Sequence, residues 1–174
     1  WDKKNNKGKC RALIINSGNA NAYTGIVGLN NIEKYTKELA DYLSCPKKEI
    51  LVSSTGVIGE QLNPNLICKK ISKLSLANNK MLIDAARSIW TTDTFVKTSI
   101  HKIKIKNQNI KIYGFAKGSG MISPNMGTML AYIFIDCEIV SKILKKLLSD
   151  NIEETFNSIS VDSDTSTSDT LMLF

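Results

Sequence analysis

The sequence predicts an α/β protein with layered sheets that are flanked by helices. Short apolar segments typical of strands alternate with segments whose apolar residues recur every three or four positions, as on a helix. Two of the strand-like segments, residues 12–15 and 50–53, each run into small polar residues that favour loops. In α/β folds such strand ends are where ligands usually bind. The length of 174 residues is typical of one domain.

Composition excludes several classes of protein. Hydrophobic residues make up 43% of the chain and charged residues 22%, which is ordinary for a globular protein and unlike a disordered one. No apolar run approaches the ~20 residues of a membrane span, and the start "WDKKNNKGKC" lacks the apolar core of a signal peptide. We therefore expect a cytoplasmic protein that does not associate with a membrane.

The basic charge balance comes almost entirely from lysine. The net charge is +7, and 21 of the 23 basic residues are lysines. Proteins that bind nucleic acids usually cluster their basic residues and add arginines or stacking aromatics, whereas these lysines are scattered along the chain. We expect a lysine-rich surface exposed to solvent and no nucleic-acid partner.

The four cysteines predict neither a metal site nor a disulfide framework. They are far apart, no C-x-x-C pair occurs, and His101 is the single histidine. We expect reduced, partly buried thiols and no bound metal. His101 alternates with apolar residues, which favours a position on a strand face over a catalytic role.

The first half of the chain predicts strands that alternate with helices. A helix is expected in "NNIEKYTKELADYLSCP", where Asn30 and Glu33 have the spacing of a capping box. The strand at residues 50–53 should end in a glycine-bearing turn. Further helices are expected in "NPNLICKKISKLSLA", where Asn63 can cap and Pro64 suits the first turn, and in "NKMLIDAARSIW".

The second half predicts a hairpin, a buried strand, a helix and a final strand. The segment "IHKIKIKNQNIKIYGFA" alternates Ile and Lys around "NQN", the pattern of a β-hairpin with one wet face. "MLAYIFIDC" has the composition of a buried strand, and "EIVSKILKKLLSD" has helical periodicity. The end, "SISVDSDTSTSDTLMLF", predicts a strand, a polar loop and an apolar run cut off within an element. We therefore expect this chain to be a piece of a longer protein.

The dipeptide Gly127-Thr128 stands directly before the predicted buried strand. If the bond before the threonine is cut, its hydroxyl becomes a nucleophile with the new α-amino group as its base. That amine has an unperturbed pKa of ~7.7–8.0, which suits a general base. A loop that merely leads into a strand can contain the same dipeptide, so these two residues do not decide between the interpretations.

Three other segments carry groups with a chemical use. Thr55 and Gly56 can present a hydroxyl and a backbone N–H to an oxyanion, or can form an ordinary turn. Lys117 in "AKGSG" can bind a carboxylate or a phosphate, although neither a Walker A loop nor a dinucleotide fingerprint is present. Asp162 and Asp164 have the opening spacing of a calcium loop, but its sixth and twelfth positions are wrong. We expect capping and turn hydrogen bonds there.

Five segments resemble, in the same order, the characteristic segments of the glutamate N-acetyltransferase / ornithine acetyltransferase family of arginine biosynthesis. They are "RALIINSGNANAYTG", "VSSTGVIGEQL", "TTDTF", "AKGSGMISPNMGTML" and "SVDSDTSTSDTLMLF". The resemblance implies a DmpA/ornithine acetyltransferase-like fold with an N-terminal nucleophile threonine. It also implies an acyltransferase that moves the acetyl group from N2-acetyl-L-ornithine to L-glutamate by a ping-pong mechanism.

The resemblance further implies that the precursor cuts itself. Cleavage would fall between Gly127 and Thr128, which gives an α chain of residues 1–127 and a β chain that starts with residues 128–174. Thr128 matches the nucleophile and also contacts substrate. The family usually has alanine before this threonine, and the small Gly127 should preserve cleavage. The β chain of the family continues beyond this sequence and contributes further substrate-binding residues.

Other roles follow from the same resemblance. Thr55 and Gly56 match the oxyanion hole, and Lys117 matches a substrate-binding lysine. A substrate-binding threonine lies in the segment that matches "TTDT", and it is either Thr91 or Thr92.

The resemblance implies no cofactor and no metal. Its partners are small molecules, namely N-acetylornithine, glutamate and, as a second acetyl donor, acetyl-CoA. The α and β chains of one precursor would form αβ units that assemble into a higher homo-oligomer. Val96 stands where the family often has proline, which should only loosen a loop. Two alternatives remain: a related self-processing amidohydrolase or aminopeptidase, and a non-catalytic lysine-rich domain that binds anions.

Overall fold

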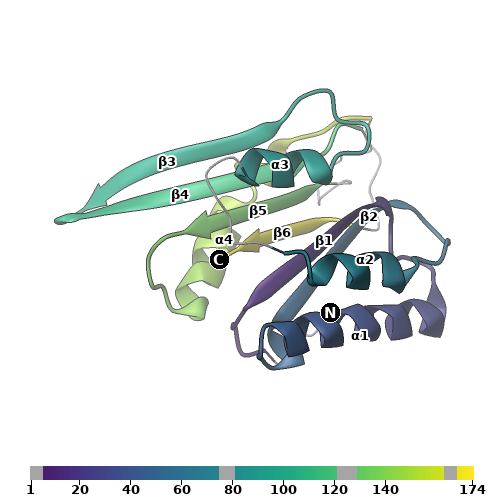
Figure 1. Cartoon of the computed structure of the whole chain (residues 1–174). Helices are drawn as coiled ribbons and strands as arrows, with labels where there is room; N and C mark the ends of the chain where they lie inside the picture. The colour runs from purple at the N-terminus through teal and green to yellow at the C-terminus, as the bar shows by residue number, and fades with distance from the viewer. Residues whose placement is uncertain (1–5, 75–80, 121–128, 163–167) are drawn as a thin grey trace. The chain divides into compact units, whose positions relative to one another are not determined.

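The protein forms two compact units, each with its own sheet and helices (Figure 1). The computed structural model describes residues 6–74, 81–120, 129–162 and 168–174. Unit 1 extends to Asn78 and unit 2 begins at Asn79, where the chain length had suggested a single domain. The predicted α/β class is confirmed, because sheets and helices occur in both units.

Unit 1 is a β-α-β arrangement followed by one more helix. Its elements in chain order are β1 (Ala12–Asn19), α1 (Gly25–Tyr42), a short 3-10 helix (Lys47–Glu49), β2 (Ile50–Val57) and α2 (Pro64–Ile71). The two strands are parallel neighbours, with Ala12 opposite Ile50 and Gly18 opposite Gly56. Ile14 packs against both clusters of buried residues to which α1 contributes. The helices therefore cover the apolar face of this strand pair.

Both strands of unit 1 are longer than the sequence predicts. The sequence favours loops after residues 15 and 53, whereas β1 continues to Asn19 and β2 to Val57. The two polar segments pair with each other, with Ser17 opposite Thr55. This pairing between distant segments outweighs the local preference of Ser, Asn and Gly for turns. The predicted glycine-bearing turn at Thr55 is therefore wrong, because this residue lies within β2.

The helix α1 begins before the predicted capping box. Asn30 and Glu33 lie inside the helix, and Thr24 is its N-cap residue. Gly28 allows the preceding loop to approach the first turn, because a Cβ at this position would collide with the side chains of Thr24 and Asn21. Those two side chains are joined by a 2.9 Å hydrogen bond from Thr24 Oγ1 to Asn21 Oδ1. The start of α1 is thus fixed by a packed loop and not by the capping box.

Unit 2 is a four-stranded sheet with two α-helices. Its elements in chain order are α3 (Met81–Ser88), β3 (Lys97–Ile105), β4 (Gln108–Lys117), β5 (Leu130–Ile135), α4 (Ser141–Asn151), a short 3-10 helix (Phe156–Ser158) and β6 (Thr170–Leu173). The strand order is β3-β4-β5-β6, with two antiparallel pairings followed by a parallel one. The helix α3 packs against β3 and β4, and α4 packs against β6.

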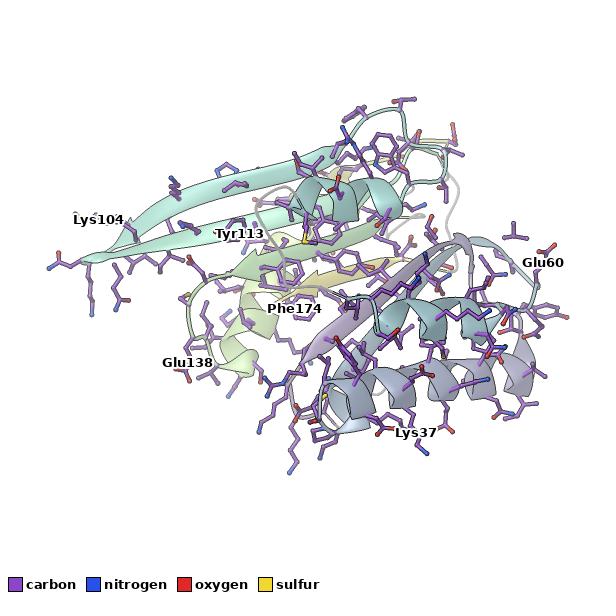
Figure 2. The ribbon with its side chains drawn as sticks, in the orientation of Figure 1. Lys37, Glu60, Lys104, Tyr113, Glu138 and Phe174 are labelled. Atoms are coloured by element: carbon purple, nitrogen blue, oxygen red, sulfur yellow. The ribbon has the colours of Figure 1, made fainter. Side chains whose placement is uncertain are left out.

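The predicted β-hairpin is confirmed as β3 and β4. Its turn lies slightly earlier than "NQN" suggests, at Lys106 and Asn107, and Lys106 has a φ of +53°. Within β4, only residues 112–117 pair with β5. The outer part of the hairpin, which carries the exposed Lys104, therefore extends beyond β5 (Figure 2).

The buried strand predicted in "MLAYIFIDC" is confirmed as β5. Leu130 and Tyr132 of this strand are fully covered. The ring centroid of Tyr132 lies 5.2 Å from that of Phe115 on β4. Two residues later in β5, the ring of Phe134 stacks on that of Phe174, which follows β6 (labelled in Figure 2), with centroids 5.0 Å apart. The chain that follows the predicted cleavage site therefore enters the core of unit 2 at once.

The remaining helices agree with the sequence. The Oδ1 atom of Asn63 accepts the N–H of Asn65 at the start of α2, and Pro64 is the first helical residue, as predicted. The helix α3 lies within its predicted segment, and α4 ends one residue beyond its own. The final apolar run contains β6, whereas the strand predicted in "SISV" is reduced to a bridge at residues 161–162. Most of the polar loop between them lies outside the described residues.

Candidate active site

The residues predicted to act on a substrate lie in both units. The predicted oxyanion pair, Thr55 and Gly56, is in unit 1. The predicted substrate-binding residues in unit 2 are Thr91, Thr92 and Lys117. The predicted cleavage site, Gly127 and Thr128, lies outside the described residues.

Lys117 is a buried cation at the end of β4. It is 2% exposed, and its Nζ donates a 3.0 Å hydrogen bond to Thr91 Oγ1. Of the two threonines that the sequence leaves open, Thr91 is thus the one that contacts this lysine. Burial lowers the pKa of the Lys117 ammonium, and the charge of Lys97 acts in the same direction. The carboxylates of Asp93 and Asp169 oppose this shift without cancelling it.

Asp93 fixes the backbone next to Lys117. Its side chain is fully covered, and its Oδ1 accepts the N–H of Gly118 at 2.9 Å and the Nζ of Lys97 at 2.7 Å. Burial raises the pKa of Asp93, but the hydrogen bonds from Gly118 and Lys97 outweigh it and hold the pKa below its usual value. Among the described residues, its Oδ2 has no hydrogen-bond partner. Sequence reasoning missed this residue, because an aspartate among threonines is also typical of a turn.

Asp169 holds the first described residue after the predicted cleavage site. Its Oδ1 accepts the N–H of Met129 at 2.9 Å, and the N–H of Thr170 donates to the Met129 carbonyl oxygen at 2.9 Å. Burial raises the pKa of Asp169, and the Met129 N–H and the charge of Lys117 offset only part of this effect. The sequence predicted local capping and turn bonds in this segment, whereas this bond reaches a residue 40 positions away.

The groups around the start of β5 form a polar cluster inside unit 2. It combines the ammonium of Lys117, the hydroxyl of Thr91 and the carboxylate of Asp93, while the Asp169 carboxylate beside them is bound to the Met129 N–H. A partly desolvated ammonium attracts a carboxylate more strongly than one in water does. Because the Thr91 oxygen already accepts from Lys117, its own proton can be donated to a second acceptor. Such a cluster suits a small zwitterionic ligand that carries a carboxylate.

Thr55 contributes a buried hydroxyl from unit 1. The residue is 0% exposed, and its Oγ1 has no hydrogen-bond partner within the described part of the chain. Ser53 lies two residues earlier on the same face of β2 and is also buried without a partner for its hydroxyl. A buried hydroxyl that donates to nothing costs ~1–3 kcal/mol. A substrate oxygen that accepts from Thr55 would recover that free energy.

Gly56 follows Thr55 at a point where only glycine fits. Its φ is +128°, and a Cβ would lie 2.5 Å from the nitrogen of Asn19 and 2.6 Å from the carbonyl oxygen of Gly18. The residue type is therefore explained by the close approach of β1 and β2. Its predicted role in an oxyanion hole remains a prediction.

The remaining features concern metal ligands, cysteines, His101 and one hollow in unit 2. Across residues 6–74, 81–120, 129–162 and 168–174, no group of three or more His, Cys, Asp or Glu side chains is placed to hold a metal ion. The cysteines are free thiols, and His101 is exposed on β3.

An apolar hollow of about 290 Å³ lies on the sheet of unit 2 beside Phe115 and Tyr132, but none of the predicted site residues lines it. None of the helices described is both long and apolar enough to cross a membrane.

Comparison with known proteins finds relatives along the whole chain. The ArgJ family model matches residues 1–174. A protein of Zymomonas mobilis named arginine biosynthesis bifunctional protein ArgJ is 45% identical over 168 residues, which are 97% of this chain and 41% of the relative. A protein of the same name from Ruegeria pomeroyi is 47% identical over 163 residues, which are 93% of this chain and 40% of the relative. The chain thus spans about two fifths of the length of these curated relatives.

A solved structure of a relative supports the fold. The crystal structure of the arginine biosynthesis bifunctional protein ArgJ from Bacillus halodurans matches with a TM-score of 0.62 and 37% sequence identity. The match covers 66% of this chain and 61% of that one. It is consistent with the layered α/β arrangement that the sequence predicts.

Proposed function

This chain belongs to the ArgJ family, and from that premise we propose that the full-length protein transfers the acetyl group of N-acetylornithine to glutamate in arginine biosynthesis. We include acetyl-CoA as a second donor, in keeping with the name bifunctional that the relatives carry. The proposed enzyme works in the cytoplasm without a cofactor, as a homo-oligomer of αβ units.

The observation that carries this proposal is the buried contact between Lys117 and Thr91 in unit 2. The contact lies beside the start of β5, and β5 begins two residues after Thr128. A buried lysine ammonium with a hydroxyl partner can bind the carboxylate of an amino-acid substrate. Self-cleavage would then place a nucleophile directly before the strand that helps to form this cluster.

The first proposed step is self-cleavage. The Oγ of Thr128 attacks the carbonyl carbon of Gly127, the C–N bond between the two residues breaks, and an ester and a free amine result. Water then hydrolyses the ester and leaves an α chain of residues 1–127. The two products stay associated in unit 2, because β4 on one side of the cut pairs with β5 on the other.

The second proposed step is acetyl transfer in two halves. The α-amino group of Thr128 takes the proton of its own Oγ, which attacks the acetyl carbon of N-acetylornithine. The amide C–N bond breaks, and ornithine leaves with the proton on its amine. Thr55 Oγ1 and the Gly56 N–H donate to the oxyanion, and loss of one such donor typically costs ~10²–10³ in turnover. The amine of glutamate then attacks the acyl-threonine, the ester bond breaks, and the proton returns to Thr128.

Intact mass spectrometry of the full-length protein tests both steps. Wild type should consist of two chains that meet before Thr128, whereas Thr128→Ala should stay in one piece. Thr128→Ser is the matched control, because it keeps a hydroxyl and should still be cut. After incubation with N-acetylornithine alone and acid quenching, one acetyl group should be found on the peptide that begins with residue 128.

Two results would contradict the proposal. Wild-type protein that remains uncut would exclude Thr128 as an N-terminal nucleophile, and an acetyl group on another peptide would place the nucleophile elsewhere. The acceptor decides between a transferase and an amidohydrolase. Glutamate should discharge the acyl-enzyme to N-acetylglutamate, whereas release of free acetate at the same rate with or without glutamate would identify a hydrolase.

A further inference from the structure

The residue directly after the predicted nucleophile is tied to unit 2 by both of its backbone groups. The N–H of Met129 donates to Asp169 Oδ1 at 2.9 Å, and its carbonyl oxygen accepts the N–H of Thr170 at 2.9 Å. The second bond belongs to the parallel pairing of β5 with β6, which begins with Leu130 opposite Thr170. The first bond uses a side chain, at a point where the strand ladder has not yet begun.

The N–H that Asp169 accepts belongs to the peptide bond between residues 128 and 129. The carboxylate therefore acts one covalent step from the proposed nucleophile. Met129 is buried, so loss of this acceptor would leave a buried N–H without a partner. The peptide would then be free to turn toward another acceptor.

We propose that Asp169 is a positioning residue that holds the peptide bond after Thr128 through the Met129 N–H, and that both self-cleavage and acetyl transfer depend on this bond. The inference rests on the proposed function of the preceding section. A shift of ~1 Å in a reacting group can cost ~10²-fold in rate. Both proposed reactions require the Thr128 hydroxyl to meet a carbonyl carbon, so both depend on how the following peptide is held.

The hydrogen bond, and not the charge, is the role assigned to Asp169. Its direct contact is with the Met129 N–H, and it forms no ion pair with Lys117, the cation that acts on it electrostatically. Asparagine keeps the oxygen acceptor and removes the charge, whereas alanine removes both. The pair Asp169→Asn and Asp169→Ala therefore separates the two roles.

Asp136 provides a matched control at the other end of β5. Its Oδ1 accepts the backbone N–H of Lys111, so it too is a carboxylate that binds a backbone N–H of the same sheet. It lies after β5, whereas the predicted cleavage site lies before it. Its bond is exposed, so Asp136→Ala should lower the melting temperature no more than Asp169→Ala does, and it should leave the chemistry at Thr128 unaffected.

The experiment follows self-cleavage of the full-length protein by intact mass and steady-state transfer by the cut fraction. Asp169→Ala should cut ~10-fold more slowly or worse, and its kcat should fall about as much while KM for N-acetylornithine stays within about twofold. Asp169→Asn should stay within about threefold of wild type in both rates. Asp136→Ala should cut and turn over at wild-type rates.

Three outcomes overturn the inference while leaving the proposed function intact. Asp169→Ala could match wild type in both rates, Asp169→Asn could be as slow as Asp169→Ala, or Asp136→Ala could be slowed equally at an equal loss of melting temperature. Failure of wild type itself to be cut or acetylated at Thr128 would instead refute the proposed function. The two failures are therefore distinguishable in one set of samples.

Discussion

Replacement of Gly56 by alanine provides the sharpest test of the geometry of the strand pair in unit 1. At φ +128° a side chain is strained, and the new Cβ would collide with the backbone of Gly18 and Asn19 at 2.5–2.6 Å. Backbone strain of this kind costs about 1–3 kcal/mol. Overpacking against atoms that cannot move freely adds about 1–3 kcal/mol. Gly56→Ala should therefore lower the free energy of unfolding by about 2–6 kcal/mol.

Gly18 provides the matched control on the neighbouring strand. Its φ of +95° is also strained, but a Cβ there would meet no heavy atom within 4 Å, beyond its chain neighbours, in the part of the chain that the structure describes. Gly18→Ala should therefore cost only the strain, about 1–3 kcal/mol. The comparison removes the common effect of a positive φ and leaves the collision.

Urea unfolding of the full-length variants, followed by far-UV circular dichroism, measures the difference. The midpoint should fall in the order wild type, Gly18→Ala, Gly56→Ala. A Gly18→Ala variant as unstable as Gly56→Ala would show that β1 and β2 do not approach as closely as described. A Gly56→Ala variant within about 0.5 kcal/mol of wild type would refute both the strain and the collision.

Two further predictions concern the polar cluster of unit 2. Thr91→Val removes the oxygen that accepts from Lys117 and should raise KM for N-acetylornithine by ~10-fold, whereas Thr92→Val should leave KM within about twofold of wild type. The reverse pattern in steady-state kinetics would assign the substrate contact to Thr92. Burial raises the pKa of Asp93, but the hydrogen bonds from Gly118 and Lys97 outweigh burial and hold this pKa below its usual value. The ionised form of Asp93 therefore stabilises the fold above pH ~4, and this stabilisation is lost as the pH falls through the lower pKa of the folded state. In urea titrations Asp93→Asn should therefore lose less unfolding free energy than wild type between about pH 7 and about pH 3, and parallel losses would contradict this.

The sequence by itself determined the type and order of most elements. The helical period of "EIVSKILKKLLSD", the cap formed by Asn63 and Pro64, and the Ile/Lys alternation of the hairpin all correspond to elements of the structure. These signals are local, because the caps and the side-chain periods are written in consecutive residues. The α/β class follows from them without knowledge of how the elements pair.

Tertiary structure decided where several elements begin and end. The small polar residues around Ser17 and Thr55 favour turns locally, yet they pair with each other and extend both strands. The first turns of α1 depend on a loop that packs against Gly28, and the predicted capping box lies inside the helix. In the strands the deciding contact joins segments far apart in the sequence, whereas at α1 it joins Gly28 to side chains four and seven positions earlier, which the helical period does not reveal.

The candidate site shows the same division. The sequence and its family resemblance supplied the reactive residue types, including Lys117 and the choice between two threonines. Only the fold showed that Asp93 accepts the N–H of Gly118, 25 positions away, and that Asp169 accepts the N–H of Met129, 40 positions away. A carboxylate that acts by accepting a distant backbone N–H carries no motif of its own, because its partner is chosen by strand pairing. The sequence therefore predicted the groups that can react, and the tertiary structure identified the groups that hold them in place.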